Sequence, residues 1–181
     1  MKLLLVILLL MQADIALANV EFNAELERQV PTFHMRKLLT AIALTESSID
    51  ISAIGLAGER GIFQFMPIGY REAGNLCPDL KLVPFENLST DLSLNVRSSI
   101  CLVGALRAFY PETDTLRNLM YVYNAGIGTF RKGIIPKSTH KYWLRFKEHL
   151  SDIYNFSTPI YNHLMWDRRI YLGTDFIPIP H

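Results

Sequence analysis

The feature that most constrains this chain is a helical stripe of apolar residues that ends on a carboxylate. Met35, Leu39, Ile42 and Glu46 recur every three or four residues, which places them on one face of a helix. A charge on an apolar helix face must be paired, neutralised or used in chemistry. Burial and the negative C-terminal end of a helix both raise the pKa of a carboxyl group, so Glu46 could act as a proton donor near neutral pH. The alternative for a lone glutamate is a side chain turned outward to solvent.

Three later segments show the same helical periodicity, and none shows the alternation of a strand. Asp91 or Ser93 can cap the first of them, and Gly126 stops the second. Residues 69–92 contain two prolines and are predicted to be a long connection. The pattern predicts one mainly α domain, and its apolar positions are Leu94, Ile100, Cys101, Val103 and Leu106, then Leu116, Leu119, Met120 and Tyr123, then Tyr142, Trp143, Phe146, Leu150 and Ile153.

The N-terminus has the pattern of a secretory signal peptide. Lys2 is followed by a short apolar run and then by Ala16-Leu17-Ala18, which is typical of a cleavage site. We therefore expect residues 1–18 to be removed and the protein to be periplasmic or secreted, with no stable membrane anchor after cleavage. The alternative is an uncleaved anchor. The formal net charge of +1 gives no reason to expect nucleic acid as a partner.

Export gives meaning to the two cysteines, Cys77 and Cys101. Disulfides persist in oxidising compartments, so a bond between them is favoured over two separate buried thiols. It would pin the predicted connection to the following helix. No Cys/His spacing suits zinc, and no metal site or cofactor is predicted.

Three short blocks follow one another along the chain. They are Ala43-Leu44-Thr45-Glu46-Ser47-Ser48, then Gly58-Glu59-Arg60-Gly61-Ile62-Phe63-Gln64-Phe65-Met66-Pro67, then Tyr123-Asn124-Ala125-Gly126. Together they resemble the soluble-lytic-transglycosylase-type catalytic domain, which is related in fold to lysozymes. Each block is weak alone, but three in the family order are strong. The resemblance implies a lysozyme-like helical domain with a cleft, which we place at residues 19–153, followed by an extension of unknown role at residues 154–181.

This resemblance also implies a reaction. Such domains cleave the β-1,4 bond between N-acetylmuramic acid and N-acetylglucosamine in peptidoglycan, and one glutamate, here Glu46, protonates the glycosidic oxygen. It then acts as a base while the C6 hydroxyl of muramic acid closes onto C1, which yields a 1,6-anhydro sugar. The reaction requires no metal. Ordinary glycosidases need a second carboxylate, which the substrate's own hydroxyl replaces in this scheme.

The motif positions imply supporting roles. Ser47 either hydrogen-bonds near the catalytic carboxyl or satisfies backbone groups at the helix end. Gln64 and Asn124 would offer amide groups to the sugar acetamido and hydroxyl groups. The hydroxyl of Tyr142, from a later segment that also resembles the family, would lie near Glu46 or the sugar. Two aromatic residues would form flat walls for the glycan, although both also fit an ordinary core; they are Phe63 and Tyr123.

Departures from the family bear on the sugar-binding subsites more than on the reaction. Glu59 stands where the family often has a small residue, and Gly55 or Leu56 stands where it has a serine. Asp50 and Glu59 are the acids nearest to Glu46 in sequence, and solvated surface positions are expected for both. If either faced Glu46 across the cleft, hydrolysis would become the better interpretation.

Two other classes of function remain open. One is a hydrolase of the goose-type lysozyme or chitinase kind. The other is a non-catalytic glycan-binding scaffold in a secretion or conjugation apparatus. Small exported members of this type often open the cell wall locally for such an assembly, so peptidoglycan and an envelope-spanning machine are the expected partners.

Overall fold

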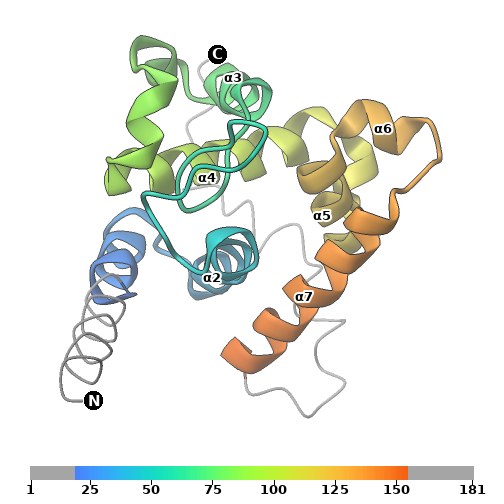
Figure 1. Ribbon diagram of the computed structural model, residues 1–181, viewed down its shortest axis with the longest axis horizontal. Coiled ribbons are helices and arrows are strands. Elements are labelled where there is room, and N and C mark those ends of the chain that lie inside the picture. The colour runs from blue at the N-terminus through green and yellow to red at the C-terminus, as the bar shows by residue number, and fades with distance from the viewer. Residues whose placement is uncertain (1–18, 155–181) are drawn as a thin grey trace, which may run out of the picture.

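The structure, a computed structural model, describes residues 19–154 (Figure 1). The predicted signal peptide and all but the first residue of the predicted C-terminal extension lie outside these residues. The described part of the first helix covers residues 19–29, and its Phe22 and Leu26 are buried in the core.

Helix α2 (Phe33–Ser47) carries the predicted stripe, and its apolar residues are buried as expected. The helix ends at Ser48, which adopts a left-handed conformation with φ 57°, and the Ser48 N–H donates to the carbonyl of Leu44. One side of α2 packs along α7 (Lys137–Tyr154), the long helix at the lower right of Figure 1. Glu46 therefore lies in the last turn of a helix whose C-terminus is capped and whose side packs against α7.

The glycine-rich segment after α2 forms a compact loop over residues 48–66. Its backbone is held by two antiparallel bridges, Ile54 with Arg60 and Arg60 with Phe65. The Gly61 N–H also donates to the carbonyl of Ala53, at 2.9 Å. The loop crosses above α2 in Figure 1 and leads directly into α3.

The prediction of a long connection over residues 69–92 is wrong. Helix α3 (Pro67–Leu76) begins with Pro67 in its first turn, where a missing N–H costs nothing. Two short 3₁₀ helices follow, η1 (Pro78–Leu82) and η2 (Phe85–Ser89). The buried face of α3 is mostly Tyr70, Ala73 and Gly74, so its apolar stripe was too weak to be recognised in the sequence.

Helix α4 (Leu92–Phe109) forms the centre of this half of the domain, and α3 packs along it. Of the two predicted caps, Asp91 is the one that caps it, with the side chain accepting from Leu94 N at 2.9 Å. The predicted disulfide between Cys77 and Cys101 is present, with a Cα–Cα distance of 5.9 Å, and ties the end of α3 to α4. Among the described residues, α4 alone is long and apolar enough to cross a membrane by length and composition, but 61% of it is buried inside the protein.

The remaining helices complete the other side of the cleft. After the 3₁₀ helix η3 (Pro111–Asp114) come α5 (Leu116–Ala125) and the short α6 (Ile127–Arg131), and α7 closes the domain against α5 and α2. Gly126 ends α5 with φ 78°, as its sequence position predicted. No strand forms in residues 19–154, so the mainly α class is confirmed.

Candidate active site

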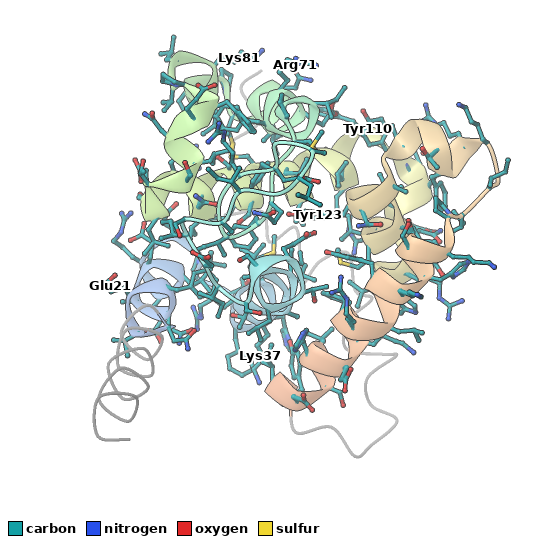
Figure 2. All side chains as sticks on the ribbon, in the orientation of Figure 1. Glu21, Lys37, Arg71, Lys81, Tyr110 and Tyr123 are labelled. Atoms are coloured by element: carbon teal, nitrogen blue, oxygen red, sulfur yellow. A yellow bond between two sulfur atoms is a disulfide. The ribbon has the colours of Figure 1, made fainter. Side chains whose placement is uncertain are left out.

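A pocket of about 400 Å³ lies between the glycine-rich loop, α3, α4 and α5. Figure 2 shows Tyr123 near the middle of the molecule, at this junction, and Tyr110 farther out toward α6. The residues that line the pocket, in the part of the chain that the structure describes, include three glutamates and no basic side chain. The polar members are Glu46, Glu59, Gln64, Glu72, Tyr110, Tyr123 and Asn124.

Glu46 is a half-buried member of the pocket lining. Burial raises the pKa of its carboxyl from 4.5 to about 7, because the charged form loses hydration. Tyr142 and Arg145, both on α7, favour the ionised form, and the negative charge of Glu59 opposes it. A carboxyl with this pKa is populated in both forms near neutral pH, so it can give a proton and take one back.

Tyr142 lies behind Glu46 rather than in the pocket lining. Its hydroxyl is buried and has no partner in full hydrogen-bond geometry among the described residues. It nevertheless lies close enough to stabilise the Glu46 carboxylate, so we regard the contact as a long or poorly aligned hydrogen bond. Contacts of this kind commonly tighten when substrate binds.

Ser47 takes the second of its two predicted roles. Its hydroxyl donates to the carbonyl of Ile62 at 2.8 Å and accepts from the N–H of Asp50 at 3.1 Å. The side chain thus ties the end of α2 to the glycine-rich loop. It positions the backbone beside Glu46 and does not bond to the carboxyl.

Gln64 lines the pocket in a strained backbone conformation, with φ 45°. Its side-chain nitrogen donates to the carbonyls of Gly61 at 2.8 Å and Ala53 at 3.2 Å. The amide nitrogen is therefore used within the loop, and the amide oxygen is left to meet a ligand. Strain that the surrounding structure maintains at a pocket residue points to a functional position.

Tyr123 and Asn124 come from the end of α5. The Tyr123 hydroxyl donates to the carbonyl of Phe63 at 3.0 Å, which joins α5 to the loop. Burial and the nearby Glu46 raise the pKa of Tyr123 well above its usual value, so it stays neutral. The Asn124 side-chain oxygen accepts from Thr139 on α7 at 2.8 Å, which leaves its amide N–H groups for a ligand.

Phe63 does not take its predicted place. The ring is fully buried and packs against Phe22 and Phe65, and it is absent from the pocket lining. It has no face to offer a sugar and belongs to the core that supports the loop.

The two candidate second acids differ. Asp50 is exposed and outside the pocket, where its carboxylate accepts from the backbone and hydroxyl of Ser52. Glu59 is half-buried and lines the pocket together with Glu46. An acid that faces Glu46 across the cleft would favour hydrolysis. Asp50 does not meet this condition, whereas Glu59 shares the pocket with Glu46.

Three further residues at the site were missed by sequence reasoning. Glu72 on α3 accepts from the Tyr110 hydroxyl at 2.9 Å, and both line the pocket. Recognition of Pro67 as a helix start would have placed Glu72 on a helix, but nothing would have paired it with Tyr110. Arg145 lies one turn after Tyr142 on α7, and this spacing was a usable signal.

The described residues hold no group of three or more His, Cys, Asp or Glu side chains able to bind a metal ion. The polar groups that line the pocket are carboxyl groups, amides and phenols. This set suits hydrogen bonding to sugar hydroxyl and acetamido groups around one proton-transferring acid.

Comparison with protein families yields one match, a model described as the transglycosylase SLT domain, which covers residues 27–146. No curated protein and no solved structure matches the chain. The family match contains Glu46, Gln64, Asn124 and Tyr142 and agrees with the resemblance found in the sequence. The chain therefore belongs to the transglycosylase SLT domain family, with its lysozyme-like, mainly helical fold and its lytic-transglycosylase-type action on peptidoglycan.

Proposed function

We propose that the protein is a peptidoglycan lytic transglycosylase that cleaves the bond between N-acetylmuramic acid and N-acetylglucosamine and leaves a 1,6-anhydro end. The observation that carries this proposal is Glu46, a half-buried carboxyl with a pKa of about 7 in the lining of a pocket. The family match supports the substrate class.

Glu46 performs both proton transfers. In its protonated form it donates to the glycosidic oxygen as the bond from that oxygen to C1 breaks. The resulting carboxylate then takes the proton of the muramic C6 hydroxyl, whose oxygen bonds to C1. The acid is regenerated, and no water is consumed. The burial that raises the pKa of Glu46 keeps it protonated for the first step.

The surrounding groups position the sugar. The free amide N–H groups of Asn124 suit the oxygen of an acetamido group, and the amide oxygen of Gln64 suits a hydroxyl or an N–H. Tyr123 presents part of its ring to the pocket while its hydroxyl is held by the loop. These contacts would hold C6–OH close to C1, which favours intramolecular attack.

The site of action that we propose is the periplasm or the exterior of the cell, after removal of residues 1–18. The Cys77–Cys101 disulfide supports an oxidising compartment. We further propose that the enzyme opens peptidoglycan locally for an envelope-spanning assembly such as a secretion or conjugation apparatus, a role that rests on its family.

Product analysis of Glu46→Gln tests the proposal. Glutamine keeps the shape and cannot transfer the proton, so we expect cleavage of purified sacculi to fall roughly 10² to 10⁴-fold while glycan binding persists. The matched control is Glu86→Gln, an exposed glutamate outside the pocket, which should retain full activity. Mass spectrometry of the wild-type digest should reveal anhydro ends. Unchanged cleavage by Glu46→Gln would show that Glu46 is not the catalytic acid. A wild-type digest with reducing ends alone would show that the product is not a 1,6-anhydro sugar.

A further inference from the structure

We propose that Glu59 is a second catalytic carboxylate of the pocket and that it gives the protein a hydrolytic activity beside the anhydro-forming one. The proposal rests on the proposed function of Glu46 as the acid, and it adds a competing fate for the same activated sugar.

The position of Glu59 is the first argument. Among the three carboxylates that line the pocket, Glu72 is engaged by the Tyr110 hydroxyl and Glu46 is the proton donor. Glu59 lines the same pocket as Glu46 and is half-buried. A ligand that fills the pocket therefore meets both carboxylates.

The Glu59 carboxylate is also anchored. One of its oxygens accepts from the backbone N–H of Ala57 at 2.9 Å. The backbone around it is fixed, because the Gly55 N–H donates to the Glu59 carbonyl at 2.9 Å and Ile54 pairs with Arg60. Such a group can be held ready for a reaction, whereas a solvated surface glutamate samples many rotamers.

Gly55 provides the room that this arrangement needs. A Cβ atom at position 55 would overlap with the Glu59 carboxylate and would lie 2.9 Å from the Gln64 side-chain oxygen. The absence of a side chain at Gly55 therefore leaves the space that the Glu59 carboxylate occupies.

Glu59 interacts electrostatically with Glu46. Its negative charge raises the pKa of Glu46, in the same direction as burial, while Tyr142 and Arg145 on α7 act against it. Tyr123, on α5, also faces Glu46 and stays neutral. The charge of Glu59 thus favours the protonated form of Glu46 near neutral pH. Glycosidases that use water divide the work between a protonated and an ionised carboxyl in this way.

The hydrolytic step balances with water as the co-reactant. Glu46 donates its proton to the glycosidic oxygen as the C1–oxygen bond breaks, and the Glu59 carboxylate stabilises the positive charge that develops at C1. The oxygen of a water molecule then bonds to C1 while Glu59 takes its proton, and the product carries a reducing end. Glu59 then loses this proton to solvent, and Glu46 takes one up from solvent, so both groups return to their starting forms. When the C6 hydroxyl reaches C1 before water does, the anhydro product forms instead.

The test is the ratio of reducing to anhydro ends in digests of purified sacculi. Wild type should produce both. Glu59→Gln should lower the reducing-end fraction at least tenfold while anhydro ends persist. Gly55→Ser should act in the same direction, because its side chain displaces the Glu59 carboxylate. Asp50→Asn is the matched control, an acid of the same segment outside the pocket, and should leave the ratio unchanged.

The outcomes separate this proposal from the proposed function. A wild-type digest with anhydro ends alone, or an unchanged ratio in Glu59→Gln and Gly55→Ser, overturns the role of Glu59 and leaves Glu46 as it is. A digest with reducing ends alone, lost in Glu59→Gln, supports Glu59 and overturns the anhydro product. If Glu59→Gln fails to fold, as judged by circular dichroism, the result from Gly55→Ser decides, since that change preserves the carboxylate and displaces it. Because the new side chain also approaches Gln64, the ratio of the two products, and not the total activity, is the readout.

Discussion

Two of the walls of the pocket are built in different ways. One wall is the glycine-rich loop at residues 48–66, whose shape is set by its backbone. The other wall consists of α5, with α7 behind it, and is set by side chains that join regular helices. Both contribute groups to Glu46, but they depend on different physical terms.

The loop wall depends on unusual backbone conformations. Gly58, Gly61 and Gln64 all have positive φ values, of 88°, 73° and 45°. Backbone hydrogen bonds hold them, among them the bond from Gln64 N to the Gly61 carbonyl at 3.0 Å. Positive φ is favourable only for glycine, so the sequence of this wall is restricted by steric fit.

The helical wall depends on side-chain hydrogen bonds between helices. The bond from Thr139 to Asn124 joins α7 to α5, and the bond from Tyr123 to Phe63 O joins α5 to the loop. Each such bond is worth about 1 kcal/mol net. A small steric change should therefore disrupt the loop wall completely. In the helical wall, each lost hydrogen bond should lower the free energy of unfolding by only about 1 kcal/mol.

The largest effect is expected for Gly61→Ala. Alanine at φ 73° is strained, and its Cβ would overlap with the Leu88 carbonyl and with the buried side chain of Asn95. Backbone strain and overpacking together should lower the free energy of unfolding by about 3 to 5 kcal/mol. Urea denaturation followed by circular dichroism measures this, and activity should fall with it.

Gly58→Ala is the matched control for that change. Its φ of 88° is equally unfavourable for alanine, but no atom lies within 4 Å of the new Cβ. Only backbone strain remains, so the expected loss is about 1 kcal/mol. Equal losses at the two positions would contradict the argument that close packing at Gly61 restricts the loop wall.

The sequence predicted the helical wall well and the loop wall poorly. The stripe in α2 and the stripes in α5 and α7 were visible because 3.6-residue periodicity reports which face is buried. This places Glu46, Tyr123 and Tyr142 on the right elements. The three motif blocks then named the reaction class, because each sits at a fixed point of the fold.

Contacts that depend on the path of an irregular backbone could not be predicted. Sequence alone does not show that Ser47 bonds to Ile62 O, or that Phe63 turns into the core while Gln64 turns to the pocket. Adjacent residues in a loop follow no period, so their directions are set by tertiary contacts. The same holds for Glu59, whose place in the pocket depends on the empty space at Gly55.

A smaller effect is expected for Tyr123→Phe, which removes the hydrogen bond that joins the two walls. The Phe63 carbonyl would lose a partner, at a cost of about 1 to 2 kcal/mol in the free energy of unfolding. Because the walls would no longer be fixed to each other, KM for glycan fragments should rise as well.

Tyr121→Phe provides the comparison for that experiment. The Tyr121 hydroxyl bonds to His140 at 2.8 Å, a contact between α5 and α7 within the helical wall. Its loss should reduce stability by a similar amount and leave KM unchanged. A rise in KM in both variants would mean that general loosening, and not the contact between the walls, controls binding.

The smallest expected effect is a shift in the pH profile, and here the two walls act with opposite sign. Glu59 in the loop raises the pKa of Glu46, while Tyr142 and Arg145 on α7 lower it. The acid must be protonated to start the reaction, so kcat/KM should fall as the pH rises through about 7. Tyr142→Phe and Arg145→Gln remove groups that favour the carboxylate, so this alkaline limb should move to higher pH. Glu59→Gln should move it to lower pH. If the alkaline limb stayed in place in all three variants, burial alone, which is the largest contribution and is common to them all, would set the proton affinity of Glu46.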